Sequence, residues 1–303
     1  MKTVGALIKR NVKIFFKDKG TFFTALITPI ILLVLYVTFL YKVYKDSFTS
    51  SIPEGFTFDP KLLDGLVGGL LLSSLLAVST VTVSFCANLS MVADKVSGAR
   101  ADFTVAPIKP HTLALGYYIA TAINGLIISA VATLLGFAYL AFTGWYLSVL
   151  DVLALFSDIF LMVLFGTALS SIVFYPLTTQ GQLSAVGTVV SAGYGFICGA
   201  YMPLSQFSAG LKNTLMLLPG TYGTSLLRNH ALRGVYTEMS KQGLPTEVVD
   251  AIKTTADCNL EFFGHGVEIW QMYLVLVGAI VLLVGGYILL HSLRGKGKNV
   301  KKV

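Results

Sequence analysis

The chain has 303 residues, of which 55% are hydrophobic and only 12% charged, and its mean hydropathy is +0.76. A water-soluble domain carries about 25% charged residues, so this composition excludes an ordinary soluble protein and a disordered one. The net charge of +7 is concentrated at the ends of apolar segments, which is typical of membrane orientation signals and argues against nucleic-acid binding.

The first 20 residues are predicted to form a separate amphipathic helix. At about 100° per residue, the apolar side chains of this segment fall on one arc and the basic ones on the other. The apolar arc holds Val4, Leu7, Ile8, Val12, Ile14, Phe15 and Phe16. The opposite side holds Lys2, Lys9, Arg10, Lys13 and Lys17. Such a helix lies along a membrane surface, either as a simple anchor or also as a contact for a partner.

Residues 21–303 are predicted to form one transmembrane domain, because about 20 apolar residues cross the hydrocarbon as a helix. The expected spans are 21–41, 63–87, 113–142, 152–174, 183–200 and 269–290. The third is long enough to tilt or project, and the fifth is short and glycine-rich, which favours a break near its outer end. The fold class is therefore an all-α membrane protein with six transmembrane helices.

Basic residues predict the orientation of these spans. With both termini in the cytoplasm, the inner segments hold 14 of the 22 Lys and Arg residues, while the outer loops are mildly acidic. The positive-inside rule favours this arrangement over its inverse. We therefore expect a multi-pass protein of the cell membrane, namely the plasma membrane of a bacterium, in contact with membrane lipid.

Small residues follow one face of two spans. In the fifth span Gly187, Ser191, Gly195 and Gly199 recur every four positions beside Tyr194, and in the second span Ser73, Ala77, Thr80 and Ser84 form a comparable line. Small residues let helices approach closely, which fits ordinary packing inside one chain. The alternative is that Ser73, Thr80, Gly187, Ser191, Tyr194, Gly195 and Gly199 line a translocation path or a dimer interface.

Asp158 is the one acidic residue well inside a predicted span. A charge at that depth costs about 2.5–3.5 kcal/mol on insertion scales, so such residues face a bundle interior or a polar cavity. The sequence leaves open whether this intramembrane acid has a structural partner or a role in transport.

Residues 201–268 form the predicted outer region. The apolar stretch 211–218 and the following segment to Arg228 are too short to span and are separated by Pro219 and Gly220. They predict a re-entrant helical hairpin between the fifth and sixth spans. A polar outer loop over 236–266 follows, with a short helix expected at 246–255.

Motifs for catalysis are missing from the sequence. It contains no G-x-x-x-x-G-K-[ST], H-E-x-x-H, G-x-S-x-G or C-x-x-C pattern, and its four histidines are far apart. Three cysteines, Cys86, Cys198 and Cys258, are too few and too scattered for a disulfide framework or a zinc site, and pairing of Cys198 with Cys258 stays open. We expect no enzymatic activity, cofactor or metal on this chain.

The most specific motif lies between the second and third predicted spans. Residues 94–108 read D-K-V-S-G-A-R-A-D-F-T-V-A-P-I. This segment resembles the E-R-E-x-G-T-L-x-x-L-L-x-T-P-V pattern of ABC-2 type permeases. Asp94, Lys95, Gly98, Phe103 and Pro107 match in register without a gap.

The resemblance extends over nearly the whole chain, with departures inside the motif. The Gly-Thr-Leu of the family is Gly98-Ala99-Arg100 here, and its usual Thr before Pro is Ala106. The resemblance implies that residues 1–20 are a connecting helix and that the loop carrying Asp94, Lys95, Gly98, Phe103 and Pro107 is a coupling helix on the cytoplasmic side. ATP and Mg²⁺ would then bind a separate ABC ATPase subunit.

The resemblance further implies a permease that works as a homodimer or with a homologous permease and exports an amphipathic or lipophilic substrate. A drug, a peptide antibiotic, a lipid or a glycan precursor would all suit such a path, and the sequence does not choose among them. The alternative is a secondary transporter or channel that needs no ATPase. The absence of an intramembrane ion-pair network beyond Asp158 and of matching broken spans argues against it.

Overall fold

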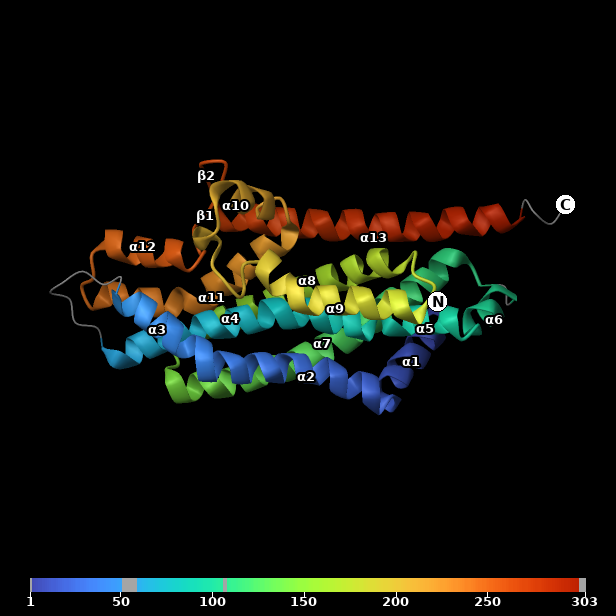
Figure 1. Cartoon of the computed structure of the whole chain (residues 1–303), viewed down its shortest axis with the longest axis horizontal. Coiled ribbons are helices and arrows are strands. Elements are labelled where there is room, and N and C mark those ends of the chain that lie inside the picture. The colour runs from blue at the N-terminus through green and yellow to red at the C-terminus, as the bar shows by residue number, and fades with distance from the viewer. Residues whose placement is uncertain (1, 51–58, 106–107, 300–303) are drawn as a thin grey trace.

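The computed structural model describes residues 2–50, 59–105 and 108–299. Long helices run side by side as one elongated bundle (Figure 1). The helices are α1 Lys2–Lys17, α2 Lys19–Leu35, the π-helix Tyr36–Leu40, α3 Tyr41–Ser50, α4 Pro60–Ala87, α5 Leu89–Val96, α6 Ala99–Val105, α7 Pro110–Thr143, α8 Val149–Phe174, α9 Gln180–Ile197, the 3₁₀ helix Leu204–Gln206, α10 Ala209–Leu215, α11 Pro219–Lys241, α12 Thr246–Thr255 and α13 Ile269–Asn299. Two short strands, β1 Leu260–Phe262 and β2 His265–Val267, pair antiparallel.

Five helical segments are long and apolar enough to cross a membrane. They are Lys19–Thr49, Pro60–Val96, Pro110–Thr143, Val149–Phe174 and Ile269–Leu293. These coincide with the predicted first, second, third, fourth and sixth spans, so the prediction of a helical multi-pass protein is confirmed. The predicted fifth span corresponds to α9, whose two glutamines and four glycines lower its apolar content below that of the other five.

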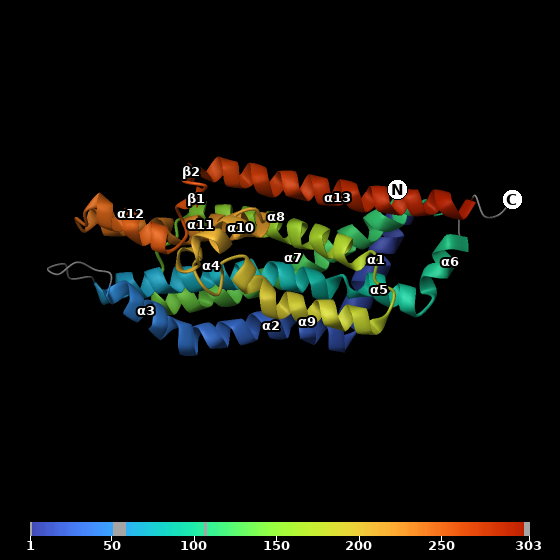
Figure 2. The same ribbon diagram turned by 45° about the horizontal axis from the view of Figure 1, so that its top comes forward.

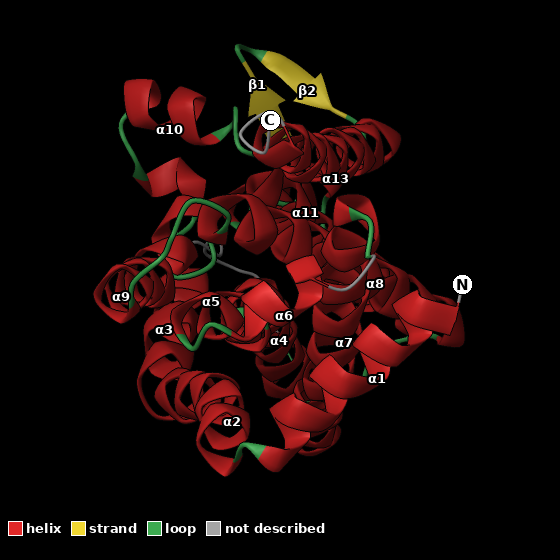
Figure 3. Ribbon diagram, turned by 90° about the vertical axis from the view of Figure 1, so that its right-hand side faces the viewer, coloured by secondary structure: helices red, strands yellow, loops and turns green. Residues whose placement is uncertain are grey.

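Helix α4 forms the centre of the bundle. The most apolar 18-residue stretch of this helix is buried along its whole length, and helices α2, α7, α8, α9 and α11 pack around it. The end-on view in Figure 3 shows α4 enclosed in this way. Its serine and threonine side chains leave room for close neighbours, and Ser73, Thr80 and Ser84 donate their hydroxyls to carbonyls of α4 itself.

Local sequence fixes where several helices begin. Ser148 and Asp151 form a reciprocal capping box at the start of α8, and Thr179 and Gln182 form another at the start of α9. Each pair satisfies backbone N–H groups that the first turn of a helix leaves without partners. At α4, Asp59 accepts a hydrogen bond from the backbone N–H of Lys61.

The region after α9 differs in part from the expectation. The second stretch of the predicted hairpin is not short: it forms the 23-residue helix α11, which ends at Lys241 inside the expected outer loop and is buried along much of its length. Close packing explains this, because α11 inserts against α4, α8 and α13. The short helix expected at 246–255 is confirmed as α12.

The bundle has two ends that are referred to below. The α6 end carries α5 and α6, and the α12 end carries α3 and α12, as Figures 1 and 2 show. In Figure 2, α6 lies at the first of these ends, next to α5 and below the last turns of α13.

Candidate functional site

Asp94, near the end of α5, is the centre of a polar cluster at the α6 end. Its carboxylate accepts two hydrogen bonds from the Arg10 guanidinium of α1, at 2.7 and 2.9 Å. It also accepts one from the Tyr117 hydroxyl of α7, at 2.6 Å. A bidentate arginine–carboxylate pair is among the strongest polar contacts in proteins. Asp94 thereby ties three helices together.

The arginine of this cluster also reaches α6. The Arg10 guanidinium carbon lies 5.1 Å from the centre of the Phe103 ring, within the range of a cation–π contact. The hydrogen bonds that Arg10 donates to Asp94 raise the pKa of Arg10, against the opposing effect of burial. Arg10 therefore stays charged and connects α1 to both α5 and α6.

Helix α1 docks on α7 beside this cluster. Leu7 and Phe15 are buried, whereas Ile14 and Phe16 of the predicted apolar arc are exposed. A Cβ atom at Gly116 of α7 would lie 2.9 Å from the Leu7 side chain, so only glycine permits this approach. The predicted helix is confirmed, but it packs on the protein as well as presenting an apolar face outward.

Lys95 points away from Asp94 and toward the end of α8. Its ammonium group donates hydrogen bonds to the carbonyl oxygens of Phe174, Tyr175 and Leu177, at 2.7–3.0 Å. These carbonyls lie at and just beyond the last residue of α8, where a cation is also favoured by the helix dipole. Asp94 and Lys95 are thus both engaged inside this chain, and the role of this segment in coupling stays a prediction.

The turn between α5 and α6 explains the glycine of the motif. Gly98 has φ of +81°, in the left-handed region that other residues rarely adopt. It follows the last turn of α5 and lets α6 begin in a new direction. Pro107 lies outside the described residues.

The side chains that α6 exposes are not the ones that the motif singled out. Phe103 is half-buried beneath Arg10, whereas Val105 is 88% exposed and Asp102 is exposed beside it. Val96 at the end of α5 is also exposed. The free face of this element is therefore apolar with a flanking acidic residue.

Asp158 of α8 has two partners inside the bundle. The Tyr273 hydroxyl of α13 donates to it at 2.6 Å, and the Nδ1 atom of His230 in α11 lies 2.6 Å from its other oxygen. Asp158 is fully buried. The arrangement fits the structural alternative, because the acid joins three helices of one chain.

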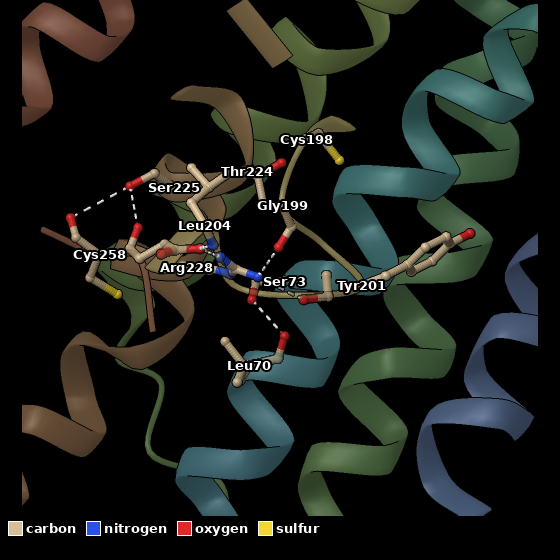
Figure 4. A network of polar contacts seen from close by, with 12 residues as sticks. Leu70, Ser73, Cys198, Gly199, Tyr201, Leu204, Thr224, Ser225, Arg228 and Cys258 are labelled. Carbon is tan, nitrogen blue, oxygen red and sulfur yellow. Dashed lines mark hydrogen bonds and ion pairs between the residues drawn. The ribbon is translucent and has the colours of Figure 1, made fainter. Parts of the chain in front are cut away.

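A second buried network joins α11 to the outer region (Figure 4). Arg228 donates to Asp257 at 2.7 Å and to the carbonyl of Gly199 at 2.6 Å, while Asp257 also accepts from the backbone N–H of Leu204. Burial raises the pKa of Asp257, and the neighbouring Arg228 opposes that rise. The ion pair holds the segment after α9 and the segment after α12 against α11.

The cysteines in the described residues are free thiols, so Cys198 and Cys258 do not pair. Cys258 is buried, and burial raises its pKa to about 11. Folding therefore shields the Cys258 thiol. Among the described residues there is also no group of three His, Cys, Asp or Glu side chains that could hold a metal ion.

The structure divides the residues predicted for a path or interface. Ser73 and Thr80 are fully buried inside α4, so their expected exposure to a path or to a second copy is wrong: other helices of this chain surround them. Gly195 faces the ring of Tyr201, and the carbonyl of Gly199 is bonded to Arg228, so these two pack inside the chain.

Two other residues of the α9 stripe lie on an open face. Gly187 is half-buried, Ser191 is exposed, and no atom lies within 4 Å of where a Cβ at Gly187 would stand. Tyr194 is buried, and its hydroxyl has no hydrogen-bond partner in the described part of the chain. An interface at Gly187 and Ser191 stays a prediction.

Sequence reasoning missed the partners of the key acids. Arg10 was placed on the solvent side of α1, and Tyr117, His230 and Tyr273 were not singled out. Helical periodicity assigned Arg10 to the basic arc, but it carries no signal for a carboxylate 84 residues away. The buried arginine Arg228 had a weak signal, because its charge lies in an apolar region.

Comparison with known proteins agrees with the motif. The family model described as ABC-2 type transporter matches residues 2–231, which is most of the chain and includes Arg10, Asp94, Asp158 and Arg228. No curated protein gives a match to this sequence.

Proposed function

Because the chain belongs to the ABC-2 type transporter family, we propose that it is the permease subunit of an exporter driven by ATP hydrolysis on separate ABC ATPase subunits. The permease of such a system is a transmembrane component and is not itself catalytic. ATP and Mg²⁺ would bind the partner, and this chain would convert the partner's change of state into a rearrangement of its helices.

The observation that carries the proposal is the construction of the α6 end. Helix α6 is held from within by the contact of Phe103 with Arg10, while Val105, its last residue, is almost fully exposed. Val96 and Val105 together give this end exposed apolar area, beside the charge of Asp102, that a protein partner would cover. We assign this face to the ATPase.

The contacts of Asp94 and Lys95 support transmission from this face. A displacement of α5 and α6 is passed to α1 and α7 through Asp94, and to the end of α8 through Lys95. A partner changes the state of a permease only if it binds two conformations with different affinity. Through these contacts, differential binding at the tip of α6 would act on the surrounding helices.

The remaining features of the proposal concern topology. We propose six spans with α9 as the fifth, and a re-entrant arrangement of α10 with the start of α11 between α9 and α13. Both termini and the α6 end would face the cytosol of a cell, and the α12 end would face outward. The basic residues of the inner segments support this orientation.

The proposed assembly contains a second permease, as a homodimer or with a homologous chain. The face with Gly187 and Ser191 supports this, because small residues on an open helix allow close approach of another helix. The proposed substrate is amphipathic or lipophilic, as suits a protein whose interior is mainly apolar.

The test uses Val105→Asp in the full chain, co-expressed with the ATPase that co-purifies with it. We expect normal amounts of permease, weaker retention of the ATPase and loss of coupled hydrolysis, because a charge replaces the exposed apolar contact. The matched control is Val149→Asp, which changes another exposed valine at the start of α8. Equal retention and export in both variants would contradict the assignment of the α6 end.

A further inference from the structure

An apolar cavity of about 480 Å³ lies between α8, α9 and α13. The first turn of α11, from Leu218 to Thr221, closes one end of it, and Phe85 of α4 forms part of its depth. Val173, near the end of α8, lies toward the α6 end. The cavity therefore occupies the part of the bundle between its middle and the α6 end.

The walls of this cavity offer no polar contact. No charged residue lines it, and its surface is formed almost entirely by carbon. The Thr221 hydroxyl donates a hydrogen bond to the carbonyl of Leu215, at 2.8 Å. The Tyr194 hydroxyl is buried against Gly220 and does not reach the cavity surface. A molecule held here must therefore present hydrocarbon to all sides.

The cavity opens onto the outside of the helix bundle, and its mouth lies on a lipid-facing part of the surface. Val189 of α9 and Leu282 of α13 line the cavity and are also strongly exposed. Helix α13 is a candidate span of which only 11% of the most apolar stretch is buried in this chain. In a multi-pass membrane protein, such a surface is in contact with the acyl chains of the bilayer.

We infer that this cavity is a binding site for one acyl chain of a membrane phospholipid, which enters sideways between α9 and α13. The head group stays outside at the membrane surface, because the walls provide nothing to replace its water and counter-ions. The inference rests on the membrane location of the chain and does not depend on the ATPase partner.

The proposed site is well placed to influence the rest of the molecule. Its walls include Cys198 at the end of α9 and the first turn of α11, which are joined to the outer region through Gly199 and Arg228. Filling the cavity adds dispersion contacts that its lining lacks when it is empty. An acyl chain would therefore stabilise the position of α9 relative to α13.

The experiment uses the full chain alone, in nanodiscs of phosphatidylethanolamine and phosphatidylglycerol. A phosphatidylglycerol with a diazirine at the end of one acyl chain is added, and labelled peptides are mapped by mass spectrometry after illumination. We expect labelling to concentrate on the cavity faces of α9 and α13, and excess unlabelled phospholipid to reduce it. The exposed face of α2, around Ile27 and Ile31, reports non-specific contact with bulk lipid.

Two substitutions on one helix separate the cavity from the general lipid surface. Ala279→Phe fills the cavity and should lower cavity labelling several-fold. Val281→Phe adds the same ring two residues away, outside the cavity lining, and should leave the labelling unchanged. Val190→Phe, on the opposite wall, repeats the first test should Ala279→Phe fail to yield folded protein.

Three results would overturn the inference. One is labelling of the cavity no greater than that of α2. Another is labelling of the cavity in both Ala279→Phe and Val190→Phe that is as strong as in the unsubstituted protein. The third is an inter-copy disulfide through Val189→Cys together with absent labelling, which would assign this face to a second copy of the chain. Because no ATPase is present, none of these results depends on whether the chain exports a substrate.

Discussion

Two of the arginine–aspartate pairs among the described residues have the same chemistry but different surroundings. Arg228 and Asp257 keep only 1% and 5% of their side-chain surface exposed, and their pair fixes the outer region on α11. Arg10 and Asp94 keep 32% and 11%, and their pair joins α1 to α5 at the α6 end. The first pair has almost no access to water, whereas the arginine of the second retains part of its hydration.

This difference indicates different uses. A buried pair is strongly destabilised by loss of one partner, because the remaining charge has no water to replace the lost contact. A partly exposed pair is weaker and opens more readily, since water competes for both groups. The Arg228 pair is therefore suited to holding a fixed structure, and the Arg10 pair to an element that moves when a partner binds.

The largest expected effect comes from Arg228→Met. Leaving Asp257 buried without its partner should lower the free energy of unfolding by about 3–5 kcal/mol, measured by denaturant unfolding in mixed micelles. The control is Lys253→Ala, which removes a surface pair with Asp250 and should change stability by less than about 1 kcal/mol. If Arg228→Met had the same free energy of unfolding as the parent protein, the buried pair would not be what holds the outer region on α11.

Arg10→Ala should have a smaller effect on the same scale. Removing charge-assisted hydrogen bonds to Asp94 is expected to reduce stability by about 1.5–3 kcal/mol and to increase amide exchange in α1. Lys9→Ala, at an exposed neighbouring position, is the matched control. If Arg10→Ala destabilised the chain as much as Arg228→Met, the contrast between the pairs would fail.

Thiol reactivity tests the outer region that the Arg228 pair holds closed. Cys258 is buried with its pKa raised to about 11, so the fraction of reactive thiolate is small near neutral pH. An impermeant maleimide should leave it unmodified in intact cells, while it reacts with Glu261→Cys on the exposed side of β1. Rapid modification of native Cys258 would show that this region opens.

The smallest expected effect is at Asp18, the N-cap of α2. Its carboxylate accepts hydrogen bonds from the hydroxyl and backbone N–H of Thr21 and from the backbone N–H of Gly20, and these lower its pKa. Because the pKa is lower in the folded state, the cap stabilises the protein above the ordinary carboxyl pKa and loses this effect as pH falls through its own.

Asp18→Ala should therefore be less stable than the parent by about 0.5–1 kcal/mol at neutral pH. The difference should shrink as the pH falls through the lowered pKa of the parent carboxyl, where that carboxyl becomes protonated. Thermal unfolding of both proteins across this pH range measures it. A difference that grows on acidification would have the wrong sign for this cap.

Apolar length and turn chemistry made much of the fold predictable. Five spans and the helix at 246–255 follow from runs of apolar residues and from their flanking polar residues. The length and burial of helix α11 were underestimated, because its charged and polar residues are typical of an exposed segment. Arg228 and His230 are buried only because Asp257 and Asp158 lie beside them in space, which no local pattern reveals.

The candidate site was predictable as a segment but not as a set of contacts. The motif at 94–108 coincides with the end of α5, with α6 and with the turn between them, and it includes Gly98, whose backbone conformation needs glycine. Adjacent charges at Asp94 and Lys95 suggested a solvated surface, yet they turn to opposite sides of α5 and bind Arg10 and the α8 carbonyls. The directions of the Asp94 and Lys95 side chains depend on partners that are distant in the sequence.

The central claim is that the α6 end receives a partner whose state is transmitted through Asp94. Hydrogen exchange of the permease in nanodiscs, with and without its co-purifying ATPase and with ATP and Mg²⁺ added, tests this most directly. We predict protection by the ATPase concentrated in 96–105, and a nucleotide-dependent change in exchange along α1. Protection confined to the α12 end, or none in α5 and α6, would contradict the account.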